Sequence, residues 1–197
     1  TSSGTLSLII NEGTIQKIYL KGKETSRDWV IWRELGFRDG NIFTVEKGRK
    51  ALTSLYGTNL FEQVLMDVGY EEGLPIITIQ MEEKPTDVSR LGFRIDNERN
   101  LQPSLEFRNE NLLGTATEIG ASFAGGVRNR KYLVDFQANR IFNSYFTLNL
   151  DAFYDLRDIN SYFTDPLQNN QKRFVRSRNG EYRQILYGLS FQLGQQV

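Results

Sequence analysis

Apolar and polar residues alternate with a period of two over most of the sequence from Val88 onward. Successive side chains of a β-strand point to opposite faces, so this pattern predicts strands with one apolar and one polar face. No helical stripe appears in this part of the chain. The alternating segments are 91–95, 105–108, 118–123, 132–139, 146–155 and 184–193. We therefore predict an antiparallel all-β segment of about six strands.

Alternation alone would also fit a soluble sheet with one face buried. Here one face is almost purely aliphatic and aromatic, whereas the other carries Asp, Asn, Gln, Arg, Glu, Gly and Ser. The longer runs reach about ten residues, the length of a transmembrane β-strand. The pattern thus favours lipid-facing barrel strands, joined by short turns and by one long polar connection from Arg157 to Arg178.

Residues 13–83 have a different pattern. A short apolar strand ends at Gly22, and Thr25-Ser26-Arg27-Asp28 resembles a helix start before residues 29–35. A second helix from Thr44 is expected to place four residues on its buried stripe: Val45, Gly48, Leu52 and Leu55. Two alternating strands follow, joined by a turn at 71–73. The expected order is strand, helix, helix, strand, strand, a small α+β unit.

This order comes with several sequence matches: Gly13-x-Ile15-x-x-Ile18-x-Leu20-x-Gly22, Ile31-x-Arg33-Glu34-Leu35, Gly40-x-x-Phe43, Leu52-x-x-Leu55-Tyr56, Asn59-Leu60-Phe61-Glu62-Gln63-Val64 and Met81-Glu82-Glu83-Lys84-Pro85. Together they resemble a polypeptide-transport-associated (POTRA) domain of the bacterial outer-membrane barrel-assembly superfamily, which includes Bam-type, Tam-type and patatin-fusion members. The run Glu110-Asn111-Leu112-Leu113-Gly114 resembles a sequence found early in that superfamily's barrel, with Ala116 where a second glycine is common.

The resemblance implies three parts. Residues 1–12, with a strand-like run at 6–11, would end a preceding domain or linker, residues 13–86 would be the POTRA domain, and residues 87–197 would be the first strands of a larger barrel. Closed single-chain outer-membrane barrels begin at about eight strands. The chain is therefore expected to be a fragment, and an open sheet with unpaired edges is expected to self-associate.

Composition excludes several function classes. Lys and Arg number 24, as do Asp and Glu, so no net positive field recruits nucleic acid. The absence of cysteine and histidine removes thiol and histidine catalysis and the usual zinc sites. No window approaches 18 consecutive apolar residues, as a transmembrane helix would need. We expect no enzyme activity, no cofactor and no metal.

One short motif imitates a catalytic site. Residues 120–124, Gly-Ala-Ser-Phe-Ala, nearly match the G-x-S-x-G nucleophile elbow of lipases. The elbow requires a strand-to-helix turn, whereas Ser122 lies inside an alternating strand with no helix after it. We interpret Ser122 as a residue on the polar face of a strand.

The resemblance implies an outer-membrane protein that assembles or translocates proteins, with its POTRA domain in the periplasm of a Gram-negative-type bacterium. Its partners would be unfolded outer-membrane or secreted clients, outer-membrane lipid and accessory lipoproteins. A client would add a strand to one exposed backbone edge: Val64, Leu65, Met66, Asp67, Val68, Gly69 and Tyr70. The side chains of Val64, Met66 and Val68 are themselves expected to pack on Leu52 and Leu55. A barrel seam is implied at Leu91, Gly92, Phe93, Arg94 and Ile95.

Two alternatives remain open at this level. The barrel and POTRA parts could anchor a secreted patatin-like enzyme encoded upstream. The chain could also be a self-contained soluble β-rich binding module. Upstream sequence and the need for detergent would distinguish these alternatives from the assembly hypothesis.

Overall fold

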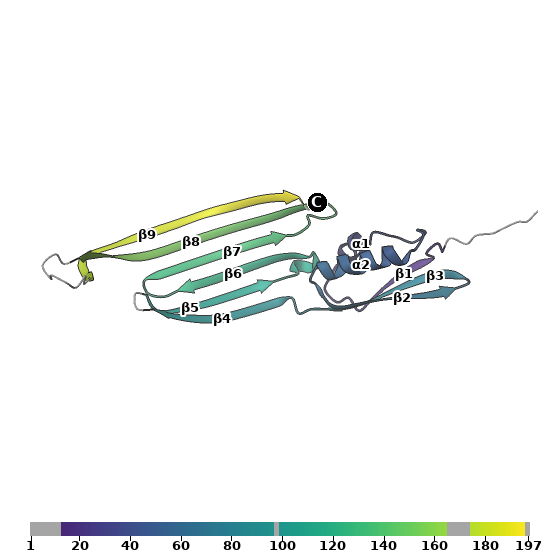
Figure 1. Cartoon of the computed structure of the whole chain (residues 1–197), viewed down its shortest axis with the longest axis horizontal. Coiled ribbons are helices and arrows are strands. Elements are labelled where there is room, and N and C mark those ends of the chain that lie inside the picture. The colour runs from purple at the N-terminus through teal and green to yellow at the C-terminus, as the bar shows by residue number, and fades with distance from the viewer. Residues whose placement is uncertain (1–12, 97–98, 165–173, 196–197) are drawn as a thin grey trace, which may run out of the picture. The chain divides into compact units, whose positions relative to one another are not determined.

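The structure is a computed structural model that describes residues 13–96, 99–164 and 174–195. The expected segment 1–12, with its strand-like run at 6–11, lies outside these residues. The chain divides into two compact units (Figure 1). Unit 1 comprises Thr1–Pro85 and Leu113–Ala116, and unit 2 comprises Thr86–Leu112 and Thr117–Val197. Each unit is described by itself.

Unit 1 contains a three-stranded sheet and two helices. Its elements are β1 (Lys17–Lys21), α1 (Asp28–Leu35), α2 (Val45–Gly57), β2 (Phe61–Glu71) and β3 (Leu74–Glu83). The strand order in the sheet is β1-β3-β2. The last strand, β3, is central, with β1 parallel and β2 antiparallel to it. Strands β1 and β2 are therefore the two edges of this sheet.

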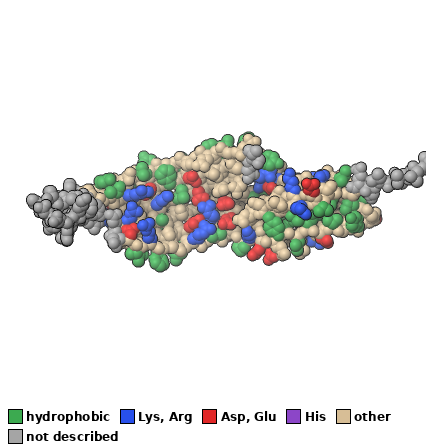
Figure 2. Space-filling view, viewed as in Figure 1, with side chains coloured by type: hydrophobic (Ala, Val, Ile, Leu, Met, Phe, Trp, Pro, Cys, Tyr) green, Lys and Arg blue, Asp and Glu red, His purple; other side chains and the backbone are tan. Residues whose placement is uncertain are grey.

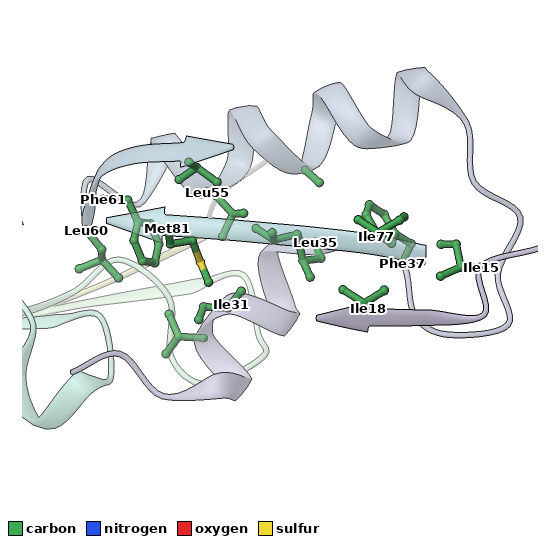
Figure 3. Close-up of a cluster of buried hydrophobic side chains, with 14 residues drawn as sticks. Ile15, Ile18, Ile31, Leu35, Phe37, Leu55, Leu60, Phe61, Ile77 and Met81 are labelled. Carbon is green, nitrogen blue, oxygen red and sulfur yellow. The ribbon is translucent and has the colours of Figure 1, made fainter. Parts of the chain in front are cut away.

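The core of unit 1 lies between the helices and one face of the sheet. Alternate residues of β3 are buried, among them Ile77, Ile79 and Met81. Ile31 and Leu35 of α1 and Leu55 of α2 pack in the same cluster. Figure 3 shows these side chains gathered around β3. Burying this apolar area is what holds the short strands and helices together.

Helix α1 begins differently from the sequence expectation. Its N-cap residue is Arg27, which makes no capping side-chain hydrogen bond. Ser26 is buried instead, and its backbone N–H donates to the Glu83 carboxylate at 2.9 Å. The helix ends at Gly36, whose φ of 69° is left-handed, as is usual for a glycine after a helix.

Helix α2 begins at the predicted place but has a different buried stripe. Thr44 Oγ1 accepts a hydrogen bond from the Lys47 N–H, 3.2 Å away, which satisfies one free donor of the first turn. The prediction for Val45 was wrong, because its side chain is 76% exposed. Ala51 lies in the core in its place, together with Gly48 and Leu55.

Strand β2 carries an irregularity that the sequence pattern did not reveal. Its pairing with β3 shifts register between Phe61 and Gln63, as in a β-bulge. The shift lets Phe61 and Val64, three positions apart, both enter the core. The turn to β3 was predicted correctly: Glu72 and Gly73 have φ values of 51° and 80°, typical of a type I′ hairpin.

Unit 2 is a six-stranded antiparallel sheet, which confirms the predicted number of strands. The strands are β4 (Asp87–Asp96), β5 (Asn100–Asn109), β6 (Thr117–Gly125), β7 (Asn129–Ala138), β8 (Phe146–Thr164) and β9 (Phe174–Gln195), each paired with the next. The predicted extent of the polar connection at 157–178 was wrong. Strands β8 and β9 continue to pair as far as Thr164 and Phe174, so long cross-strand pairing replaces most of that loop.

Cross-strand register keeps the two faces of this sheet distinct. One row on the apolar face runs through Leu105, Phe123, Tyr132, Tyr154 and Tyr187. The Tyr132 ring centroid lies 5.1 Å from that of Phe123 and 6.3 Å from that of Tyr154. The apolar face therefore includes a packed aromatic row, an arrangement that stabilises neighbouring strands.

The segment Leu113–Ala116, which connects β5 to β6, packs with unit 1. The Arg27 N–H donates to the Gly114 carbonyl at 2.9 Å. Gly114 has a φ of 74°, and an added Cβ would lie 2.2 Å from the Thr25 carbonyl oxygen. Only glycine fits this conformation and this contact, which gives a structural reason for the last residue of the run 110–114.

Candidate partner-binding edge

Strand β2 presents one open backbone edge. It pairs with β3 on one side only, within the part of the chain that the structure describes. The backbone direction follows from Val64, whose N–H donates to the Tyr56 hydroxyl at 3.0 Å and whose carbonyl accepts from it at 3.3 Å. Because Tyr56 belongs to α2, the backbone groups of Val64 point away from β3. By the two-residue repeat, those of Met66, Val68 and Tyr70 point away as well.

Burial decreases along this edge. Val64 is 3% exposed, Met66 is partly buried, and Val68 and Tyr70 are 36% and 75% exposed. All four side chains lie on the helix-facing side of the sheet, the same face as the buried residues of β3 with which they pair. The expectation of core packing thus holds for Val64 and in part for Met66, but not for Val68. The second half of β2 offers both unpaired backbone groups and uncovered apolar side chains.

Helix α2 covers the apolar face of the first half of β2. An added Cβ at Gly48 would lie 3.3 Å from the Met66 sulfur and 3.0 Å from the Phe43 ring. The helix therefore approaches β2 closely at this point, which a larger residue would prevent. The residues of β2 after Met66 are not part of the buried cluster. Leu65, on the opposite face of β2, is 51% exposed.

The other predicted site lies at an edge of the second sheet. Leu91, Gly92, Phe93, Arg94 and Ile95 all belong to β4, whose one neighbour among the described strands is β5. Three of these residues, Leu91, Phe93 and Ile95, are largely exposed on the apolar face. No feature of β4 beyond its edge position distinguishes a seam. The two predicted sites lie in different units.

The polar face of unit 2 carries a charged network. Arg108 of β5 makes two hydrogen bonds to Asp135 of β7, at 2.8 and 3.1 Å. The Arg108 guanidinium also lies 3.1 Å from Glu106 and 3.5 Å from Glu118. Figure 2 shows positive and negative side chains gathered over this sheet. One guanidinium thus contacts three carboxylates from three strands, and the network acts as a cross-strand clamp.

Glu83, at the end of β3, fixes the start of α1. Its carboxylate accepts the N–H groups of Thr25 and Ser26, each at 2.9 Å. Burial raises the pKa of this carboxyl, but the hydrogen bonds from Ser26 and Thr25 lower it, and the pKa ends below its ordinary value. The ionised carboxylate therefore anchors the two residues that precede the N-cap residue Arg27.

The described residues contain neither a metal-binding cluster nor a nucleophile elbow. Residues 13–96, 99–164 and 174–195 contain no cluster of acidic side chains arranged to hold a metal ion. Within the same ranges, no helix is long and apolar enough to cross a membrane. Ser122 lies in the middle of β6, paired with Glu106 and Leu133, and not in a strand-to-helix turn. The resemblance to a nucleophile elbow is therefore one of sequence only.

Sequence reasoning missed Tyr56 as part of the edge. Tyr56 was noted as part of the POTRA-like motif Leu52-x-x-Leu55-Tyr56. The sequence did not reveal that its hydroxyl reaches the backbone of Val64. The only available signal was the spacing of eight residues between a helix-end tyrosine and the following strand. That spacing alone does not specify a hydrogen bond.

No family model matches the chain, but two sequence relatives are named as outer membrane protein assembly factors. The outer membrane protein assembly factor BamA of Neorickettsia risticii is 23% identical over 145 residues, which are 73% of this chain and 20% of that protein. A Treponema pallidum protein with a provisional name as an outer membrane protein assembly factor is 26% identical over 115 residues, or 55% of this chain and 14% of that protein. The chain thus spans a fifth or less of the length of these relatives.

A solved structure agrees in fold. BamA from Haemophilus ducreyi lacking POTRA domains 1–3 has a TM-score of 0.64 and 15% identity, covering 93% of this chain and 44% of that one. The fold and the two sequence relatives both indicate a likeness to outer membrane protein assembly factors. The chain is therefore similar in sequence and in fold to bacterial outer-membrane protein assembly factors.

Proposed function

We propose that this chain is part of an outer-membrane protein that assembles or translocates other proteins, and that the β2 edge of unit 1 binds their extended segments. Unit 1 would be a POTRA domain in the periplasm, spanning residues 13–86. Residues 87–197 would be the first strands of a larger barrel, with the apolar face of the sheet against outer-membrane lipid. The role includes no catalysis. A seam at β4 and accessory lipoproteins remain predictions.

The observation that carries the proposal is the open edge from Met66 to Tyr70. Its backbone groups point away from β3, and the apolar side chains of Val68 and Tyr70 are exposed beside them. An extended chain can pair with such an edge and place alternate apolar side chains on the same face. Unfolded outer-membrane proteins carry segments of that kind, because their strands alternate apolar and polar residues.

The occupant is therefore an amphipathic strand rather than a helix or a folded surface. A helix has no free backbone groups to pair with the β2 edge. The chain supplies a suitable probe from its own sequence, because residues 185–193 of β9 alternate apolar with small or polar residues in nearly every position. A synthetic peptide of this sequence serves as the model of a client strand in the binding experiments.

Val68→Pro tests the proposal. Proline removes the outward N–H of Val68, and an edge strand tolerates proline where that N–H does not pair with its neighbour. Binding of the 185–193 peptide to the full chain in detergent micelles should weaken at least about tenfold, because one pairing position is lost and the ring obstructs its neighbours.

Val68→Ala is the matched control, since it keeps the N–H and removes only part of the apolar side chain. It should weaken binding by about two- to threefold. Fluorescence of Trp29 and Trp32, the two tryptophans of the chain, verifies that unit 1 stays folded in both variants. A folded Val68→Pro protein that binds the peptide as tightly as the parent would overturn the proposal.

A further inference from the structure

The Tyr56 hydroxyl occupies the β2 edge at a single position. It accepts the Val64 N–H at 3.0 Å and donates to the Val64 carbonyl at 3.3 Å. One hydroxyl thus supplies both partners that a residue of a neighbouring strand would supply. Tyr56, near the end of α2, therefore occupies the β2 edge at Val64.

We propose that Tyr56 is a positioning residue that ends strand addition at Met66 and so fixes which part of the edge a client uses. The inference rests on the proposed function and deepens it. A strand that pairs from Tyr70 to Met66 breaks no existing hydrogen bond. A strand that continues to Val64 must first displace both hydrogen bonds of the Tyr56 hydroxyl.

The structure holds this hydroxyl firmly. Tyr56 follows Leu55, which is fully buried and anchors the last turn of α2 in the core. Thr58 then closes the helix: its hydroxyl donates to the Leu55 carbonyl at 2.6 Å, and its N–H donates to the same carbonyl at 3.2 Å. The tyrosine ring therefore projects from a fixed helix end and not from a loop.

The register shift beyond Val64 strengthens the same limit. Pairing between β2 and β3 is irregular between Phe61 and Gln63. A bulge bends its strand and interrupts the regular alternation that an added strand would follow. Tyr56 therefore closes the last regular position of the edge, and the usable part is the stretch from Met66 to Tyr70.

Tyr56→Phe removes only the hydroxyl and keeps the ring. In the free full chain, hydrogen exchange at the Val64 amide should become about two- to tenfold faster, because that N–H loses its protein acceptor. Tyr19→Phe on β1 is the matched control: Tyr19 is also a partly exposed tyrosine of unit 1, and its substitution should leave Val64 exchange unchanged. Equal Val64 exchange in the parent and Tyr56→Phe proteins would overturn the inference.

Two peptides then measure the usable length. The five-residue peptide 187–191 can pair from Met66 to Tyr70, whereas the nine-residue peptide 185–193 can extend past Val64. In the parent chain, the nine-residue peptide should bind about as tightly as the five-residue peptide, because Tyr56 blocks pairing at Val64. In the Tyr56→Phe protein, the affinity of the nine-residue peptide should exceed that of the five-residue peptide by about two- to tenfold. The same length dependence in both proteins would contradict the inference. If neither peptide binds any variant, the proposed function fails, while Val64 exchange still decides whether Tyr56 closes the edge.

Discussion

Arg108 and Asp135 form a two-pronged ion pair although their strands are not neighbours. Strand β6 lies between them, and its residue in the same cross-strand row is Gly120. An added Cβ at Gly120 would lie 2.7 Å from the Asp135 carboxylate and 2.8 Å from the Arg108 guanidinium. Because Gly120 has no side chain, the Arg108 side chain can reach across β6 to Asp135. One ion pair therefore spans three strands, β5, β6 and β7.

Substitution of Arg108 should destabilise the sheet more than substitution of Asp135. Arg108→Gln leaves Asp135 and Glu118 without their cation, so it should cost about 2 kcal/mol, whereas Asp135→Asn should cost about 1 kcal/mol. Urea unfolding of the full chain, followed by far-ultraviolet circular dichroism in micelles, measures both. Equal costs below about 0.3 kcal/mol would mean that the pair is only a surface contact.

The role of Gly120 can be separated from that of the ion pair. Gly120→Ala should destabilise the sheet in the parent chain, because the new methyl group displaces the guanidinium and the carboxylate. The same change should cost less in an Arg108→Gln background, where the long side chain is gone. Urea midpoints of the two single variants and the double variant provide the test. If the stability losses of Gly120→Ala and Arg108→Gln simply add in the double variant, the two side chains do not compete for the same space.

Glu83 should make unit 1 sensitive to acid. Its folded-state pKa lies below its ordinary value of 4.5, so the stabilisation is present above pH 4.5 and is lost as the pH falls through the lower folded-state value. Glu83→Gln should remove this loss and cost about 1 kcal/mol at neutral pH after allowance for solvent screening.

Tryptophan fluorescence reports the Glu83 effect, because both tryptophans lie in α1. The parent and Glu83→Gln proteins are compared by urea titration at pH 7 and in steps below pH 4.5. A stability difference that does not shrink at low pH would show that the ionised carboxylate does not hold the helix start.

The buried stripe of α2 and the core of β3 can be tested with two truncations. Ile77→Ala removes three carbons from a fully buried site and should cost about 3 kcal/mol. Val45→Ala removes two carbons from a side chain that is 76% exposed and should stay within about 0.5 kcal/mol. A stability loss at Val45 as large as that at Ile77 would mean that the Val45 side chain is buried, as the sequence pattern predicted.

Periodicity predicted much of this fold, because burial imposes it on the sequence. The six strands of unit 2, the two helices and the hairpin at Glu72-Gly73 all follow from spacing and turn residues. Features that depend on contacts distant in sequence were not predictable. Tyr56 meets the backbone of Val64, and Glu83 accepts the N–H groups of Thr25 and Ser26, only after the chain has folded.

Other errors had local causes. The exposed Val45 was placed in the core because a helical stripe does not reveal where the covering surface ends. The segment 157–178 resembled a loop because its polar residues can also extend a two-stranded ladder beyond the apolar part of the sheet. The open β2 edge was selected through family resemblance, and the burial gradient from Val64 to Tyr70 came from the structure alone.

The most direct test of the central claim is disulfide trapping of a strand on β2. The chain has no cysteine, so a single Asp67→Cys change on the exposed face of β2 gives a unique attachment point. Peptides 185–193 that each carry one cysteine should form a disulfide with Asp67→Cys at alternate peptide positions and not with Tyr19→Cys on the opposite edge. Equal trapping on both edges, or at every peptide position, would contradict strand addition at β2.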